Sequence, residues 1–278
     1  MTSKKIALCL SGKIGNVVGK SGYHNSDMRI LQKSFEHYDR HILQKNNVDV
    51  FVHCWDEQFK EEVDKLYKPK LSKYEKQIYF DIPSYVKGKS VRKNNHYSRW
   101  YSNLQAINLK KQYEKENNMT YDFVMLTRFD LAFEKDVVFD LYNDQKFYAG
   151  NWSAVYDSYG RDLFKGGRGP LYSIDKNTLS NMRLKYGLKG YPHTKDGFLD
   201  LWFFSNSENS NKFFSLYNHL NEYTKPGNCP LDAAGTISNH QLAKYHLREI
   251  NLLNKLDFTL HMYDDFALTR RKYFDCRK

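Results

Sequence analysis

An arginine and a carboxylate follow directly on a short apolar run near the middle of the chain. Residues 123–126 are Phe-Val-Met-Leu, and Arg128 and Asp130 come just after them. The run is too short for a typical helix, and its unbroken apolar character is typical of a strand buried on both faces of a parallel sheet. Ligands of open α/β sheets bind beyond the carboxyl ends of the strands. The pair is therefore a candidate anion and metal site, and an Arg–Asp ion pair that closes a loop is the alternative.

A glycine-rich loop follows the first predicted strand. Residues 5–10 (KIALCL) form that strand, Ser11 and Gly12 end it, and the loop continues to residue 22. Loops of this kind let phosphate groups approach the backbone closely. Residues 15–21 (GNVVGKS) invite comparison with a P-loop. Three residues rather than four separate the glycines, and the segment lies too far from the strand, so the match fails.

A helix and a second strand come next. Asp27 can cap a helix whose apolar face includes Leu31 and Ile42, and residues 48–54 (VDVFVHC) form the strand. A strand–helix–strand order implies parallel pairing through a right-handed crossover. The Ser11–Gly12 and His53–Trp55 strand ends should then share one edge of the sheet. His53 is either a hydrogen-bonded structural histidine or a ligand residue, and Trp55 either packs at the rim of the core or stacks on a nucleobase.

The rest of the chain alternates between short strands and helices, which predicts an α/β protein with a mainly parallel central sheet flanked by helices. We expect helices over residues 98–118, from Ser205 to Ser210 onward, and over 238–249. We expect short strands at residues 78–82, 147–152, 171–174, 201–204 and 258–262. The glycine-rich segment 160–170 is a candidate lid. Asp196 and Asp200 flank the entrance to the 201–204 strand.

Composition narrows the class of partner. Lys and Arg number 43 against 32 Asp and Glu, a net charge of +11, which favours nucleic acid, an anionic membrane surface or a phosphorylated substrate. The four cysteines form no C-x-x-C motif, so we expect a reducing compartment without disulfides. No run has the length of a transmembrane helix. These features predict a cytoplasmic protein that has no transmembrane segment and is basic enough for peripheral membrane contact.

Six segments together carry a family resemblance. KIALCLSGKIG, VDVFVHCWD, YSRWYSNLQAINLKKQYE, YDFVMLTRFDLAF, DLWFFSNSENSNKFFSLY and FALTRR occur in this order and reach nearly from end to end. The set resembles glycosyltransferases of bacterial surface-polysaccharide loci and of large DNA viruses and phages, including the enzymes, among them a xylosyltransferase, that build algal-virus capsid glycans. The resemblance implies a GT-A-like fold in one globule, with a nucleotide-sugar-binding half (1–135) and an acceptor-binding half (136–278). For a viral protein, the compartment would be the host cytoplasm.

The resemblance also implies roles for the Arg-x-Asp triplet. GT-A enzymes carry Asp-x-Asp there and hold a divalent ion that bridges the donor diphosphate. Arg128 cannot ligate a cation, but it can pair bidentately with phosphate oxygens. Asp130 remains a candidate ligand for Mn²⁺ or Mg²⁺, and a metal-free mechanism with Arg128 and nearby lysines is the alternative. Relatives have Ser-Gly-x-x-Arg in the first loop, where this chain has Gly15 in the last position, so Lys13 or Lys20 is the expected substitute.

The implied reaction is transfer of a sugar from a nucleotide donor, UDP-sugar or more narrowly UDP-xylose, to a hydroxyl of a glycan or glycoprotein acceptor. Asp200 is the candidate base for that hydroxyl and Asp196 the second choice, whereas a turn or cap role is the structural alternative. Arg128 would stabilise the leaving diphosphate. The expected donor-binding residues are Ser11, Gly12, Lys13, His53, Trp55, Arg128 and Asp130. His261 is a weaker candidate for a metal ligand, and a structural role is favoured.

Two other functions fit part of the sequence. A nucleotide-dependent kinase or sulfotransferase would use the glycine-rich loop and Lys20. A basic nucleic-acid-binding module would use tyrosine, tryptophan and lysine faces. The second ranks lower because the basic residues are spread over many segments and no nucleic-acid-binding motif is present.

Overall fold

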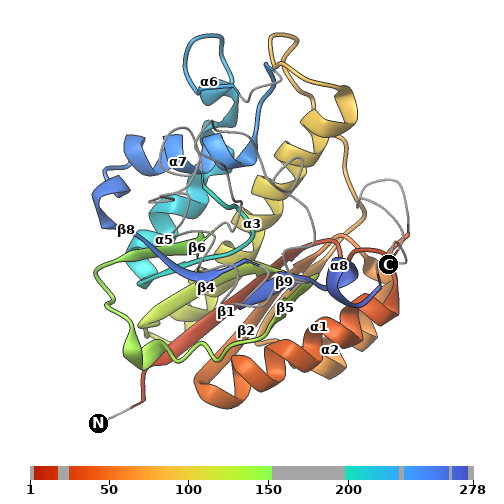
Figure 1. The fold of residues 1–278 in the computed structure, drawn as a ribbon, viewed down its shortest axis with the longest axis vertical. Coiled ribbons are helices and arrows are strands. Elements are labelled where there is room, and N and C mark those ends of the chain that lie inside the picture. Colours follow the sequence, from red (N-terminus) through yellow and green to blue (C-terminus); the bar gives the residue numbers. More distant parts are fainter. Residues whose placement is uncertain (1–2, 18–24, 152–197, 232–234, 263–264, 275–278) are drawn as a thin grey trace, which may run out of the picture.

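The computed structural model describes residues 3–17, 25–151, 198–231, 235–262 and 265–274. They form one mixed α/β domain (Figure 1). The strands are β1 (Lys5–Gly12), β2 (Asn47–Cys54), β3 (Leu71–Tyr74), β4 (Phe123–Arg128), β5 (Leu131–Phe133), β6 (Phe147–Asn151), β7 (Phe203–Ser205), β8 (Leu256–His261) and β9 (Phe266–Leu268). The α-helices are α1 (Met28–His41), α2 (Lys60–Tyr67), α3 (Ser90–Glu116), α5 (Ser207–Phe213), α6 (Leu220–Tyr223), α7 (Asn239–Glu249) and α8 (Thr269–Tyr273). Single turns of 3₁₀ helix occupy Leu43–Lys45, Glu57–Phe59, Phe139–Leu141 and Leu253–Lys255, and a longer one occupies Phe214–His219.

Seven strands build the central sheet in the order β3-β2-β1-β4-β7-β6-β8, and β5 and β9 pair separately. β3, β2, β1 and β4 are parallel, β7 is antiparallel to β4 and β6, and β6 and β8 are parallel. The expectation of a mainly parallel α/β sheet is confirmed. The division of the chain into a donor half and an acceptor half stays a prediction.

Helices cover both faces of this sheet, which is why its central strands are apolar on both sides. α1 and α2 lie on one face and α3, α5 and α7 on the other (Figure 1). Leu8 on β1 belongs to the core beneath α1, and its neighbour Cys9 belongs to the core beneath α3. The run at residues 123–126 is buried throughout, as its composition predicts.

The helix starts predicted at Asp27, at residues 205–210 and at residue 238 are confirmed, whereas Ser98 lies inside α3. Asp27 accepts a hydrogen bond from the Arg29 backbone N–H and caps α1, and Ser238 caps α7 through the His240 N–H. The cap of α5 is Asn206, whose side chain accepts from the Asn209 N–H. Each of these oxygens satisfies a donor that the first helical turn leaves open.

Residues 78–82 do not form the expected strand, and α3 begins at Ser90 rather than near residue 98. The edge strand is instead β3, which pairs with β2. The Phe80 backbone N–H donates to the Asn94 side chain at 3.0 Å, and the Phe80 ring packs against Tyr97 and Tyr101. These contacts with α3 take the place of strand pairing. The apolar residues of the 78–82 segment therefore pack against a helix, although their pattern predicts a strand.

The strand order reverses between β1 and β4. From β1 the chain proceeds outward to β2 and β3 through α1 and α2, and then returns through α3 on the opposite face to β4, on the other side of β1. Connections that leave neighbouring strands on opposite faces open a crevice at the strands' carboxyl ends. α3 runs back from that edge, so its first turns stand beside the ends of β1 and β4 (Figure 1).

Candidate functional site

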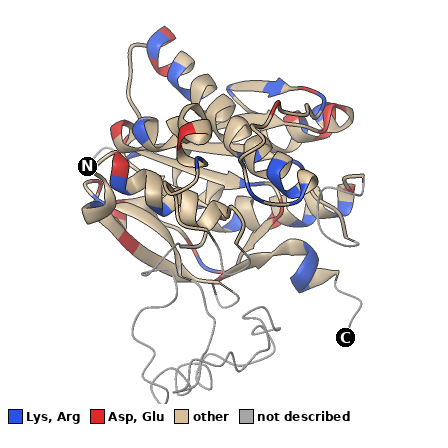
Figure 2. Ribbon diagram, turned by 90° about the horizontal axis from the view of Figure 1, so that it is seen from above, with Lys and Arg blue, Asp and Glu red and all other residues tan. Residues whose placement is uncertain are grey.

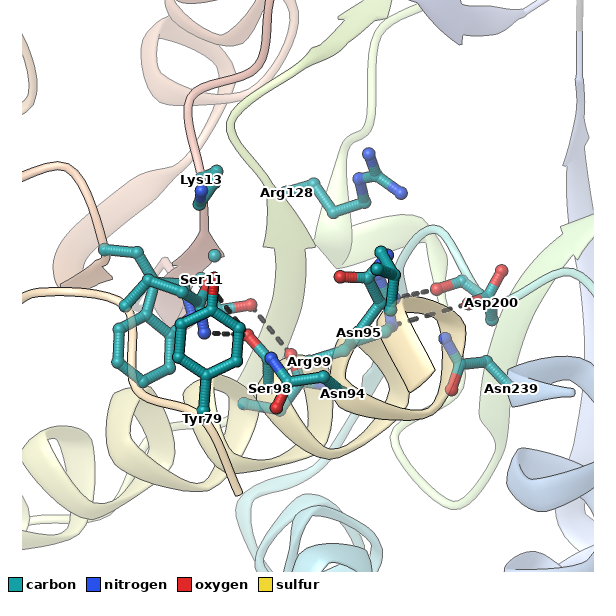
Figure 3. A pocket seen from close by; sticks show the side chains of 15 residues that line it. Ser11, Lys13, Tyr79, Asn94, Asn95, Ser98, Arg99, Arg128, Asp200 and Asn239 are labelled. Carbon is teal, nitrogen blue, oxygen red and sulfur yellow. Dashed lines mark hydrogen bonds and ion pairs between the residues drawn. The ribbon is translucent and has the colours of Figure 1, made fainter. Parts of the chain in front are cut away.

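A cleft of about 360 Å³ lies at this reversal point. Its lining comes from the ends of β1 and β4, the loops after β2 and β3, the first turns of α3, and two segments of the second half of the chain (Figure 3). The lining residues are Ser11, Gly12, Lys13, Trp55, Gln77, Tyr79, Val91, Asn94, Asn95, Ser98, Arg99, Asn103, Arg128, Asp200 and Asn239. Tyr79 and Asp200 stand at opposite ends in Figure 3, with Lys13 and Arg128 along the side that faces α3.

Strand register explains why distant residues meet here. Ser11 is paired with Arg128 on one side and with His53 on the other, so the three occupy one row at the carboxyl edge. The expectation that both strand ends share an edge is confirmed. Of the predicted site residues, the structure brings Ser11, Gly12, Lys13, Trp55, Arg128 and Asp200 into the lining, and it places His53 and Asp130 behind it.

His53 supports the cleft wall. It is fully buried, its Nδ1 lies 2.6 Å from the Ser102 hydroxyl, and its Nε2 lies 2.8 Å from Glu75. Its ring packs edge-on against Trp55, which in turn stacks on Tyr101. Burial lowers the pKa of His53 to about 4, although Glu75 acts in the opposite direction. The neutral imidazole therefore orients Trp55 rather than facing a ligand.

Arg128 and Asp130 form the ion pair that the sequence left as an alternative, and Arg128 lines the cleft as well. Arg128 Nε donates to Asp130 Oδ1 and Nη2 donates to Oδ2, both at 2.7 Å. Arg270 Nη1 lies 3.6 Å from Asp130 Oδ2. Burial acts to lower the pKa of Arg128, but Asp130 outweighs it and the net direction is upward. The guanidinium stays charged.

The opposite end of the cleft holds a second buried carboxylate. Asp200 Oδ2 lies 3.4 Å from Arg99 Nε, Oδ1 lies 3.3 Å from His240 Nδ1, and Arg99 also donates to the Asp200 backbone carbonyl. Burial would raise the pKa of Asp200, but Arg99, His240 and Arg128 lower it to about 2. Asp200 is ionised at neutral pH and, in this arrangement, is a weak base.

The sequence reasoning missed the polar stripe of α3. Asn95, Arg99 and Asn103 recur every four residues and share one helical face, which lines the cleft. Asn103 is 1% exposed and accepts a hydrogen bond from the Ser11 hydroxyl at 2.8 Å. The signal was available, because polar residues at helical spacing between apolar ones are out of place on a buried face.

Three buried donors in the lining have no hydrogen-bond partner among the described residues: Trp55 Nε1, Asn103 Nδ2 and Arg99 Nε, which lies 3.4 Å from Asp200 Oδ2. A buried polar atom without a partner costs free energy. Whichever way the Asn103 amide is turned, Ser11 engages one of its two polar atoms. These unpaired donors in the cleft wall favour a ligand that carries hydrogen-bond acceptors.

Tyr79 stands at the mouth of the cleft, and the residue is 89% exposed. Its neighbours are fixed, because Gln77 donates to Ser98 at 2.9 Å and the Phe80 N–H donates to Asn94. A large aromatic ring held out from an anchored segment beside a cleft is a surface on which a planar or sugar ring can stack.

The described residues do not fit a divalent-metal site at Asp130. Both of its carboxylate oxygens face guanidinium groups, and a Cβ added at Gly15 would meet Asp130 Cβ at 3.2 Å on another side. Gly15 has a φ of 100°, which favours glycine. In the described ranges no three His, Cys, Asp or Glu side chains cluster as a metal site, and His261 belongs to no such group.

Several predicted features lie outside the described residues and are not tested. These are Lys20, the segment 160–170, the strand at 171–174, Asp196 and Cys276. The remaining cysteines, Cys9, Cys54 and Cys229, are buried free thiols. Within the described ranges no helix is long and apolar enough to cross a membrane.

Positive charge is spread over the described surface. Figure 2 shows Lys and Arg on many helices and loops, with Asp and Glu interleaved. Nucleic-acid-binding proteins gather basic residues on one face or along one helix. The distribution therefore gives no support to the nucleic-acid-binding alternative.

Comparison with known families and with curated proteins finds no match to this chain.

Proposed function

We propose that this protein is a GT-A-like glycosyltransferase that moves a sugar from a nucleotide-sugar donor to a hydroxyl of a glycan or glycoprotein acceptor. The observation that carries the proposal is the cleft at the strand-order reversal, where two cations, Lys13 and Arg128, lie between aromatic rings at one end and a carboxylate at the other. Open α/β sheets bind nucleotides at such reversal points.

The order of side chains along the cleft matches the order of groups in a nucleotide sugar. Trp55 and Tyr79 line the end of the cleft where the base would lie, and Tyr79 offers an exposed aromatic ring on which the base can stack. Ser11, Gly12 and Lys13 on the β1 end, with Arg128 opposite, would receive the diphosphate. The sugar would then lie toward Asp200 and Arg99. The resemblance adds the donor class, a UDP-sugar such as UDP-xylose, and an acceptor in a surface or capsid glycan.

In the reaction, the bond between the sugar's anomeric carbon and the diphosphate oxygen breaks, and a bond from the acceptor oxygen to that carbon forms. The diphosphate leaves with the electron pair, and the acceptor hydroxyl loses its proton. Arg128 and Lys13 would stabilise the charge on the departing diphosphate. Asp200 is the one acid among the described lining residues. With a pKa of about 2 it is better suited to orient the hydroxyl than to remove its proton early.

Binding of nucleotides tests the proposal first. A ligand that binds the native state raises its thermal midpoint with the logarithm of ligand concentration over Kd. We expect one nucleoside diphosphate among UDP, GDP, CDP and ADP to raise the midpoint, and its sugar derivative to release nucleoside diphosphate on addition of a glycan acceptor. Stabilisation by ATP alone, with phosphate rather than sugar transferred, would instead support a kinase.

Substitution of Asp200 tests its role. Asp200→Asn should keep the donor Kd within about threefold and lower kcat by roughly a hundredfold or more, because orientation or proton transfer at the hydroxyl is lost. Asp27→Asn, which alters the carboxylate that caps α1 outside the cleft lining, is the matched control and should leave both constants unchanged. Weaker donor binding with normal kcat would contradict the role.

A further inference from the structure

Arg128 presents an unused hydrogen-bonding edge to the cleft. A guanidinium has five N–H groups. Asp130 takes one from Nε and one from Nη2, which leaves three with no partner among the described residues. The free groups form the Nη1–Nη2 edge, a planar fork that matches two oxygens of a phosphate. The residue lines the cleft, with 24% of its side chain exposed.

Asp130 is placed to hold that fork in position. It is 1% exposed, and its backbone carbonyl accepts a hydrogen bond from the Thr269 N–H at 2.9 Å. The antiparallel pairing of β5 with β9 brings this segment of the C-terminal chain alongside, and Arg270 follows at once. Asp130 is thus held in place through its backbone and through two guanidinium groups. It binds the Nε–Nη2 edge of Arg128 and so fixes the orientation of that guanidinium.

The charge in the cleft supports one ligand class. Lys13, Arg99 and Arg128 line it against Asp200 alone, so the described lining has an excess of two positive charges. Behind the lining, Arg270 Nη1 lies 3.6 Å from Asp130 Oδ2. A diphosphate that bridges two groups carries about one negative charge per phosphate, and it therefore matches this excess. A divalent cation added to the described residues would double the positive charge beside a carboxylate that already faces two guanidinium groups.

We propose that the cleft binds a diphosphate on the free edge of Arg128 without a divalent metal ion, and that Asp130 is the positioning residue that turns this edge into the cleft. The proposal rests on the proposed function for the identity of the complete donor. We call the diphosphate site formed by Arg128, Asp130 and Lys13 the diphosphate clamp. This clamp depends only on the positions of these three residues.

Binding of inorganic pyrophosphate and of UDP, measured by isothermal titration calorimetry in EDTA and again in excess Mn²⁺, tests the clamp. We expect the Kd in EDTA to lie within about threefold of the Kd in Mn²⁺. Arg128→Lys should weaken binding in EDTA roughly tenfold or more, because a lysine offers no planar fork. Arg29→Lys is the matched control, since Arg29 makes the same two-bond pair with Asp27 away from the cleft, and it should change Kd less than twofold.

A double-mutant cycle separates positioning from general stabilisation. Asp130→Asn should weaken pyrophosphate binding roughly tenfold in the native background and leave Kd unchanged in the Arg128→Lys background, because Asp130 acts through Arg128. Equal losses in both backgrounds would contradict positioning. If Asp130→Asn does not fold, the metal comparison on the unaltered protein and Arg128→Lys still decide the proposal.

Different experimental results would contradict the diphosphate clamp and the proposed glycosyltransferase function. Sugar transfer that needs Mn²⁺, with pyrophosphate bound only in its presence, would overturn the clamp and leave a glycosyltransferase. Metal-free pyrophosphate binding that depends on Arg128, with no nucleotide sugar turned over, would leave the clamp and overturn the function.

Discussion

The protein contains two Arg–Asp pairs of nearly identical geometry in very different surroundings. In both, the partners are two residues apart and joined by two hydrogen bonds: Asp27 with Arg29, and Arg128 with Asp130. The side chains are 64% and 19% exposed for Arg29 and Asp27, but 24% and 2% for Arg128 and Asp130. An exposed pair contributes little to stability, and a buried pair pays for desolvation. Geometry alone therefore does not distinguish a cap from a site, whereas burial and an open cleft do.

The largest expected difference between the pairs is in stability after the carboxylate is removed. Asp130→Ala removes the carboxylate that accepts two hydrogen bonds from the buried Arg128 guanidinium and should lower the free energy of unfolding by roughly 3 to 5 kcal/mol. Asp27→Ala removes a helix cap and should cost about 1 kcal/mol. Urea unfolding of both variants measures the difference, with Asp27→Asn as a control that keeps a capping oxygen. Similar losses at the two sites would show that burial does not separate them.

Asp200 with Arg99 is an intermediate case, with side chains 11% and 13% exposed. The folded-state pKa of Asp200, about 2, lies below the usual value, so its ionisation stabilises the fold above about pH 4 and this contribution is lost as pH falls toward 2. The contribution is roughly 2 kcal/mol. Asp200→Asn should be less stable than the native chain near pH 6, with the difference narrowing between pH 4 and 2. A constant difference across unfolding curves in this range would contradict the ionised, paired carboxylate.

The smallest expected effect is that of salt. The Asp27–Arg29 coupling energy from a double-mutant cycle should be below about 1 kcal/mol and nearly vanish in 1 M NaCl, because exposed charges are screened. The Arg128–Asp130 coupling should change much less, since solvent ions do not reach Asp130. Equal salt sensitivity in the two cycles would mean that the cleft pair is solvated like the surface pair.

Much of the cleft lining could be predicted because the ends of buried strands can be located from the sequence. Apolar runs that stop at Ser11 and Arg128 mark the carboxyl edge of a parallel sheet, and the structure pairs these two residues. The family resemblance implies Asp130 as a candidate metal ligand, and the local sequence does not reveal that Arg128 and Arg270 face both of its oxygens.

Residues on α3 and at the C-terminus were harder to find. Arg99 and Asn103 matter because their helix crosses the sheet at the end of β1, and Arg270 matters because β9 pairs with β5. Neither juxtaposition follows from local pattern, since both join segments far apart in the chain.

The sequence by itself determined the α/β class, the central strands, the Asp27 helix cap and the position of Arg128 at the end of a central strand, because these depend on periodicity and on neighbours within a few residues. Only the tertiary structure decided that His53 turns into the wall, that Asp130 is enclosed by arginines, and that Arg99 accompanies Asp200. Those outcomes depend on which face of each element is covered and on which distant charges share the buried space, and the cost of burying a charge is set by those neighbours.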